Sequence, residues 1–334
     1  MAKTSKLPGV PVVRFSHSMA FIGLLRKLGA PTDRYLESSK LPRLCEDPDW
    51  LIPVPRMYAF LDTAARKEEP ALGWWVGESV GDLQLSNPLR NLLETAPSLL
   101  VALQSLAQLV NSESSGIDVG IRHRKDHIVV FTQYPALRGV PGYAVGQAYQ
   151  ISVFVSLVQL FLGKNWQPAE IGLECRSMPR ELPGQYPGSR ISPGSKFGYF
   201  TVQRSRLHHS MAGGPAGNAT NGGLPSLDQL DELELMRGVL RSYLAEGYVS
   251  RTYAAELLDT SVRSLTRRLS KHGTTYQKLI DNLRFEVAKE HLENPGMRVR
   301  DVANAVGFED QGDFTRAFRR ISGLTPSEFR RAVS

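Results

Sequence analysis

Two short segments near the C-terminal end repeat one pattern, a pair of helices separated by a tight turn. In residues 251–273, Ala255 and Leu258 share one helical face, and a break follows at Asp259. Ser261 is then a suitable N-cap for a second helix. The inner face of that second helix holds the apolar residues Val262, Leu265 and Leu269. The pattern predicts a helix-turn-helix unit.

The opposite face of this second helix carries side chains that hydrogen-bond and attract anions. They are Arg263, Ser264, Thr266, Arg267 and Lys271. These residue types read base edges and clamp phosphates when a helix enters the DNA major groove. A solvated basic face on a structural helix pair has the same composition, so one segment alone leaves both interpretations open.

Residues 299–322 repeat the same pattern of two helices separated by a turn. Gly307 is placed to end a first helix in the left-handed conformation, and Phe308 to close the core. The inner positions of the two helices are Val302, Ala303, Val306, Phe314, Ala317, Phe318 and Ile321. The outer positions of the second helix are Gln311, Asp313, Thr315, Arg316, Arg319 and Arg320. Two such units in one small domain favour DNA binding over the structural alternative.

A continuous apolar stripe from Tyr276 to Leu292 predicts a long helix between the two units, which stops before Pro295. About 17 to 19 residues at 1.5 Å each make a rod of roughly 26 to 28 Å. Such a rod can hold two reading helices about one DNA turn, roughly 34 Å, apart. We therefore expect both helices to enter successive major grooves on one face of the duplex.

The same residues resemble a known family. The run GFEDQGDFTRAFRRISGLTPSEFR, Gly307–Arg330, is similar to the signature of AraC/XylS-type transcriptional regulators, and Ala255–Leu269 is similar to their first helix-turn-helix. The resemblance implies a bacterial DNA-binding regulator whose DNA contacts are made by the two outer faces above. Asp259 stands where a turn glycine is common, and Gly312 where a serine often starts the second reading helix. The cap of that helix must then come from Asp310 or be lost, in which case the second unit docks less rigidly than the first.

A glycine-rich stretch separates this all-helical part from the rest. Met211–Ser226 has five glycines, two prolines and no charge, the composition of a flexible linker. We expect a ligand-binding or dimerisation domain over residues 1–210, a linker over 211–227 and a DNA-binding domain over 228–334. The formal charge of +7 divides into +6 for residues 1–227 and +1 for residues 228–334, so bulk charge does not locate the DNA-binding half.

The N-terminal part contains both helical and strand-like patterns of apolar residues, which predicts an α+β domain. Helical patterns cover residues 21–28, 56–66 and 92–110, and strand patterns cover 117–123, 127–133, 170–175 and 197–202. The apolar run Ile151–Leu162 is about 12 residues, short of the roughly 20 of a membrane span, and predicts a buried helix. Leu24–Glu37, Gly73–Asp82 and Lys196–Val202 resemble the ligand-binding domain of ornithine-utilisation-type regulators, which implies an effector site, a dimer contact or both.

Other chemistry has little support in the sequence. Cys45 and Cys175 are too few and too far apart for a zinc site, and they are expected to be packed thiols. His123 and His127 have the spacing of a helical zinc pair within a strand-like pattern. Trp74 and Trp75 fit a core or dimer contact better than a ligand cage. We expect no catalytic residue, metal or cofactor.

The sequence thus predicts a cytoplasmic, nucleoid-associated regulator of transcription, an activator controlled by its N-terminal domain. The expected partners are double-stranded promoter DNA, a second copy of the chain bound through residues 1–210, RNA polymerase and a small-molecule effector, with no membrane. One alternative is a constitutive regulator whose N-terminal domain only dimerises or binds a partner protein. A more remote alternative is a DNA-repair alkyltransferase fusion, for which the cysteines are too few.

Overall fold

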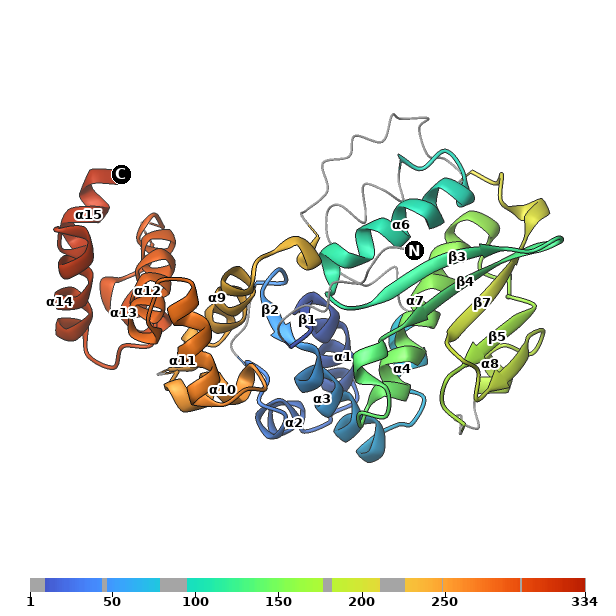
Figure 1. Cartoon of the computed structure of the whole chain (residues 1–334), viewed down its shortest axis with the longest axis horizontal. Coiled ribbons are helices and arrows are strands. Elements are labelled where there is room, and N and C mark those ends of the chain that lie inside the picture. The colour runs from blue at the N-terminus through green and yellow to red at the C-terminus, as the bar shows by residue number, and fades with distance from the viewer. Residues whose placement is uncertain are drawn as a thin grey trace.

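The computed structural model describes residues 10–43, 47–78, 95–176, 182–210, 226–247, 249–294 and 296–333. Figure 1 shows a larger N-terminal part of strands and helices and a smaller C-terminal part made of helices. This layout confirms the expected fold class. Most of the expected linker, together with Cys45, Leu92, Leu93 and Pro295, lies outside the described residues, and the domain limits stay predictions.

The N-terminal part contains a smaller antiparallel sheet and a larger mixed sheet. Their strands are β1 (Val12–Arg14), β2 (Leu51–Pro53), β3 (Asp118–His123), β4 (His127–Gln133), β5 (Glu170–Leu173), β6 (Arg190–Pro193) and β7 (Gly198–Gln203). The larger sheet has the order β3-β4-β7-β5-β6, in which only β5 and β6 run parallel, and β1 pairs with β2 in the smaller sheet. The strand pair expected over 117–123 and 127–133 is confirmed.

Helices cover one side of the larger sheet and surround the smaller one (Figure 1). They are α1 (Ser16–Lys27), α2 (Thr32–Ser38), α3 (Val54–Lys67), α4 (Leu72–Glu78), α6 (Leu99–Glu113), α7 (Tyr143–Leu162) and α8 (Leu182–Gln185). The expected helices at 21–28 and 56–66 are confirmed within α1 and α3. Ser98 caps α6 by accepting a hydrogen bond from the Val101 backbone, so this helix starts two residues after Pro97.

Helix α7 is the centre of the N-terminal part. Gly73 and Gly77 let α4 cross it closely, because an added Cβ at Gly73 would lie 2.3 Å from the Val145 carbonyl oxygen. Ser152 and Ser156 of α7 then donate hydrogen bonds to backbone carbonyl oxygens of α4, at 2.9 and 3.0 Å. The segment from Gly73 that the sequence singled out is therefore a helix-crossing motif up to residue 78, where its described part ends.

The buried helix expected from Ile151–Leu162 exists but is longer. The helix begins at Tyr143. Its first two turns contain glycine, glutamine and tyrosine, so they do not belong to the continuous apolar run from which the helix is predicted. Within the described part of the chain, α7 alone is long and apolar enough to cross a membrane, and two thirds of that stretch is buried inside the fold.

The C-terminal part forms one helical core. Its helices are α9 (Glu232–Ser242), α10 (Arg251–Leu257), α11 (Val262–Lys271), α12 (Tyr276–Leu292), α13 (Val299–Ala305), α14 (Gln311–Ser322) and α15 (Pro326–Val333). The apolar stripe of α12 is buried as expected. Two inner-face assignments are wrong, since Val262 is 36% and Ile321 38% exposed. Both lie in the terminal turns of their helices, beyond the layer that packs.

The two parts share core residues at their junction. Val12 of β1 and Leu51 of β2 are buried in the same cluster as Met236 and Val239 of α9. Figure 1 shows α9 lying beside β2, between the two halves. Ser242 at the end of α9 donates a hydrogen bond of 2.8 Å to the Leu51 carbonyl oxygen. The smaller sheet is therefore the platform on which the helical part rests.

Candidate nucleic-acid interface and cavity

The first helix-turn-helix unit is built from α10 and α11. Asp259 adopts a positive φ of 47° in the turn, as its place in a glycine position requires. Ser261 caps α11 by accepting a hydrogen bond from the Ser264 backbone, and Leu265 and Leu269 are buried. The predicted reading face is then exposed at Arg263, Thr266, Arg267 and Lys271 and half-buried at Ser264.

The second unit is built from α13 and α14. Gly307 has the expected positive φ, 79°, and an added Cβ there would lie 2.7 Å from the Gly247 carbonyl oxygen. Asp310 accepts a hydrogen bond from the Asp313 backbone and so supplies the cap that Gly312 cannot. The predicted reading face is exposed at Gln311, Asp313, Arg316, Arg319 and Arg320 and half-buried at Thr315. Thus α14 begins with an intact cap.

The basic residues of the two faces differ in their partners. Arg316 pairs with Asp313 one turn earlier, and Arg320 pairs with Asp281 of α12 at 2.8 Å. Arg263, Arg267, Lys271 and Arg319 make no ion pair within the described part of the chain. Thr266 and Thr315 donate their hydroxyl hydrogens to backbone carbonyls of their own helices, at 2.9 and 2.8 Å. Each hydroxyl oxygen keeps lone pairs that can accept a hydrogen bond.

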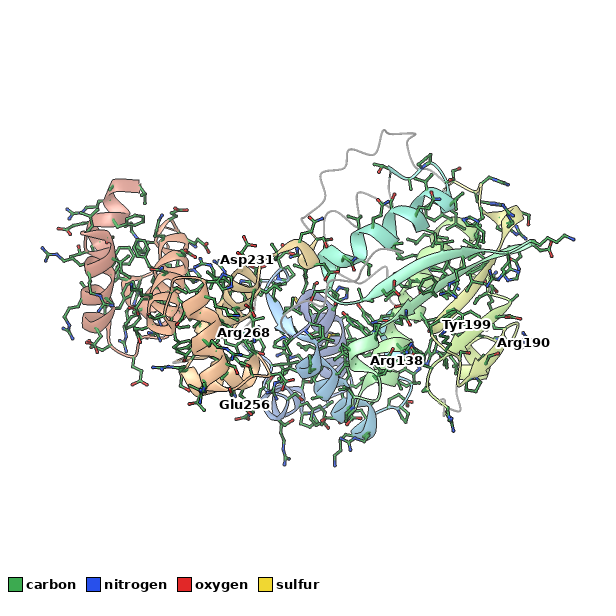
Figure 2. The ribbon with its side chains drawn as sticks, viewed as in Figure 1. Arg138, Arg190, Tyr199, Asp231, Glu256 and Arg268 are labelled. Carbon is green, nitrogen blue, oxygen red and sulfur yellow. The ribbon has the colours of Figure 1, made fainter. Side chains whose placement is uncertain are left out.

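Two arginines outside the predicted faces hold the units in place. Arg268 turns away from the reading face and pairs with Glu232 of α9. Figure 2 shows Arg268 at the inner side of the helical part. Arg284 of α12 is buried, with its guanidinium 4.8 Å from the centre of the Phe308 ring and a hydrogen bond to the Gly307 carbonyl oxygen. In the sequence, Arg284 can be recognised as a charged residue within the apolar stripe of α12.

The second reading helix is fixed by an aromatic cluster. Phe318 of α14 lies 4.9 Å from Phe285, 5.7 Å from Phe314 and 5.6 Å from Phe329 between ring centres. Thr325 and Glu328 form a capping box at the start of α15. The backbone hydrogen bond from Thr325 lowers the pKa of Glu328.

Helix α12, with 17 residues, is a strut of roughly 26 Å between the two units.

The first unit is also tied to the N-terminal part. Glu256 of α10 pairs with Lys40, and Arg56 donates a hydrogen bond of 2.9 Å to the Glu256 carbonyl oxygen. Figure 2 shows Glu256 where α10 meets the N-terminal helices. The hydrogen bond from Lys40 lowers the pKa of the Glu256 carboxyl group. Tyr243 at the end of α9 donates a hydrogen bond to the Lys40 carbonyl oxygen, at 2.8 Å.

A cavity lies in the N-terminal part, directly behind the smaller sheet. Its empty volume is about 750 Å³, including the space open to solvent. Helices α3, α6 and α7 and strand β1 supply its walls, and Val13 of β1 lines it. Val13 is the neighbour of Val12, which faces α9. Successive side chains of a strand point to opposite faces, so a single strand separates the cavity from the helical part.

One end of the cavity is polar. His17 lies with Nε2 3.4 Å from Glu113 Oε2 and with Nδ1 2.9 Å from the Tyr149 hydroxyl. Burial raises the pKa of Tyr149 well above its usual value, which keeps this phenol protonated. Sequence reasoning missed all of these residues, because they come from three separate helices that only the fold brings together.

The remaining candidate residues lie elsewhere. Trp74 is fully buried in the core, and neither Trp74 nor Trp75 lines the cavity. His123 ends β3 and His127 starts β4, so they flank a turn and do not share a helix. Cys175 is half-buried, and burial raises the pKa of its thiol, as for a packed thiol.

Two known families match the chain. Residues 254–332 match a family described as a helix-turn-helix domain. Residues 29–208, more than half of the chain, match a family described as the N-terminal arabinose-binding domain of the AraC transcription regulator. The two matches fall on the helical part and on the part that contains the cavity.

Individual proteins match over shorter stretches. The ornithine utilization regulator of Pseudomonas aeruginosa is 43% identical over 79 residues, which are 24% of this chain and 23% of that protein. The raffinose operon transcriptional regulatory protein RafR of Pediococcus pentosaceus is 36% identical over 96 residues, 28% of this chain and 35% of that protein. These matches span about a third or less of each relative. The solved structure of the transcriptional regulator CdpR from P. aeruginosa is 20% identical, with a TM-score of 0.38, and covers 90% of this chain and 96% of that one.

Proposed function

Because the chain belongs to the AraC family of transcription regulators, with an N-terminal ligand-binding domain and a DNA-binding helix-turn-helix region, we propose that it is a transcriptional activator controlled by its N-terminal domain. The observation that carries this proposal is the shared core at the junction. Val12 packs against α9 while Val13, the next residue, lines the cavity. A ligand that displaces β1 therefore also displaces the surface on which the DNA-binding region rests.

DNA contacts are assigned to the outer faces of α11 and α14. Arg263, Arg267 and Arg316 contact base edges or the nearest phosphates, and Arg to guanine is the commonest base contact. Lys271, Arg319 and Arg320 lie further round and hold phosphates. The remaining polar contacts to DNA come from the side chains of Ser264, Thr266, Gln311, Asp313 and Thr315. Arg316 must exchange its pairing with Asp313 for a contact to DNA.

The working complex is a homodimer joined through the N-terminal domain, residues 1–210. Joining two DNA-binding regions raises the effective concentration of the second one near the operator, so affinity increases without a new base contact. An activator at a promoter also contacts RNA polymerase. We place the protein in the cytoplasm, associated with the nucleoid, and assign it no catalytic step.

A reporter assay in cells, paired with gel shifts on the full-length protein, tests the control by the N-terminal domain. Fragments selected from sheared genomic DNA supply the operator. Glu256→Gln removes the ion pair to Lys40 at the junction, while Glu290→Gln removes an ion pair of α12 with Arg241 inside the helical part. An exposed ion pair is worth up to about 1 kcal/mol, so Glu256→Gln should change reporter output about two- to fivefold.

The two variants separate the proposal from a constitutive regulator. Output that changes for Glu256→Gln and not for Glu290→Gln supports control through the junction. Equal output from both variants and the wild type refutes that control and favours the constitutive alternative. A full-length protein that selects no DNA fragment refutes the proposed function as a whole.

A further inference from the structure

The walls of the cavity are unsuited to a ligand with many polar groups. Among the described residues, most of its lining is apolar: Val13, Val54, Met57, Leu106, Leu109, Val110, Ile117, Val153, Phe154 and Leu157. These side chains come from β1, α3, α6 and α7 and from the loop after α6. A sugar or an amino acid bound here would leave hydroxyl or charged groups against hydrocarbon, and each unpaired group lowers affinity strongly.

The polar side chains of the lining are mostly bonded to one another. Ser114 hydrogen-bonds with the Tyr134 hydroxyl. Gln150 accepts a hydrogen bond of 2.9 Å from Thr132 and donates one of 3.4 Å to the Tyr58 hydroxyl. These groups shape the wall and leave few partners for a ligand.

At the end formed by His17 and Glu113, one ring nitrogen stays available to a ligand. The buried Nε2 of His17 makes no hydrogen bond within the described residues, although Glu113 Oε2 lies 3.4 Å from it. An imidazole nitrogen beside a carboxylate can serve a ligand hydroxyl, which both donates and accepts a hydrogen bond. The guanidinium of Arg14 is already engaged: its Nε donates to the Ser112 carbonyl oxygen and lies 4.0 Å from Glu113 Oε1, and its Nη1 pairs with Asp49 at 3.0 Å. A ligand carboxylate would therefore meet Glu113 without a free arginine.

We propose that this cavity binds a mostly hydrocarbon molecule with one uncharged hydroxyl group, which lies between His17 and Glu113, and that it does not bind a sugar or an amino acid. The proposal rests on the proposed function, since it names the effector class of the N-terminal domain. It departs from the sugars and the amino acid in the names of the matched family and relatives. An apolar lining with one polar end is a common form of small-molecule site.

Binding of defined probes to the full-length protein tests the ligand class without any DNA. The probes are 1-decanol, decanoate, L-arabinose and L-ornithine, and the affinity is measured by calorimetry and by the shift of the unfolding midpoint. We expect 1-decanol to bind at least about tenfold more tightly than decanoate, because only decanoate would bring a further carboxylate beside Glu113, whose ion-pair partner Arg14 is already shared with Asp49. L-arabinose and L-ornithine should give no shift.

Two matched substitutions on α7 locate the site. Val153→Trp fills the cavity and should weaken 1-decanol binding at least about tenfold, while Leu160→Trp, on an exposed part of the same helix, should leave it unchanged. Glu113→Gln should narrow the difference between decanoate and 1-decanol. If Glu113→Gln does not fold, the pair on α7 still decides.

Several results overturn the proposal. They are binding of L-arabinose or L-ornithine, equal affinity for decanoate and 1-decanol in the wild type, no binding of 1-decanol, and 1-decanol binding that Val153→Trp leaves intact. These results concern the ligand class alone. Tight 1-decanol binding that has no effect on DNA affinity or reporter output would leave the ligand class standing and count against the proposed control.

Discussion

Arg267 and Arg268 are neighbours in the sequence and have opposite surroundings in the structure. Arg267 is exposed on the outer face of α11 and makes no ion pair among the described residues. Arg268 is only 19% exposed and pairs with Glu232 of α9. Replacing each by alanine in the full-length protein removes the same charge and the same side chain from adjacent positions. Only the direction of the side chain differs.

The structure gives different magnitudes for the two changes. A base or close phosphate contact of Arg267 is worth about 1 to 3 kcal/mol of binding free energy, which is about 5- to 150-fold in Kd. Its loss should change the free energy of unfolding by less than about 0.5 kcal/mol, as for an exposed side chain. Arg268→Ala breaks a half-buried ion pair and should cost about 1 to 2 kcal/mol of stability. Its effect on Kd should be less than about threefold.

Fluorescence anisotropy on an operator duplex, over a range of salt concentrations, measures both Kd and the number of phosphate contacts. Arg267→Ala should lower the slope of log K against log salt by about one if Arg267 holds a phosphate. If Arg267 reads a base, the slope should persist and the preference for the operator over unrelated DNA should fall. Urea unfolding of the same samples gives the stability of each variant.

Operator binding by Arg267→Ala at wild-type affinity would show that the outer face of α11 does not meet DNA. A loss of affinity in Arg268→Ala without a loss of stability would place the contact surface on the side of α11 that faces α9. Either outcome would require a different docking of the first unit.

Three further predictions follow from particular residues. Gly307→Ala should cost at least about 1 kcal/mol more in urea unfolding than Gly323→Ala, since both have positive φ but only Gly307 has a carbonyl oxygen within 2.7 Å of the added Cβ. The lowered pKa of Glu256 means that its contact with Lys40 is complete above the ordinary carboxyl pKa of 4.5 and weakens as pH falls through the lowered value, so the acid-induced loss of stability should be smaller in Glu256→Gln. Full-length protein should sediment as a dimer at micromolar concentration and protect more DNA than one helical part covers; a monomer with a short footprint would contradict this.

The C-terminal part was largely predictable because its information is local. The period of apolar residues, the Ser261 cap, the positive φ at Asp259 and Gly307 and the capping box at Thr325 are all set within a few residues of each other. The N-cap that Asp310 supplies to α14 was also predictable. Gly312 has no side chain to cap the helix, and an N-cap depends only on the first turn that follows it. Val262 was misplaced because helical period alone does not show where a packed layer ends.

The N-terminal part was less predictable for a physical reason. Strands β1 and β2 have three residues each, too few for a two-residue period to be recognised. Their pairing joins Val13 to Ile52, 39 positions apart, and depends on the helices that pack around them. The start of α7 was missed because Gly146 and Gln147 are buried there by contact with other elements and not by their own hydrophobicity.

The sequence by itself determined that this chain has a helical DNA-binding region and which faces of its second helices are exposed, because capping and helical period depend on near neighbours. Only the tertiary structure decided that the cavity, β1 and α9 lie in direct succession. It also decided that Arg268 turns inward and that His17 and Glu113 meet. Those relations join residues from distant segments, and they exist only once the hydrophobic clusters of both parts have closed around the smaller sheet.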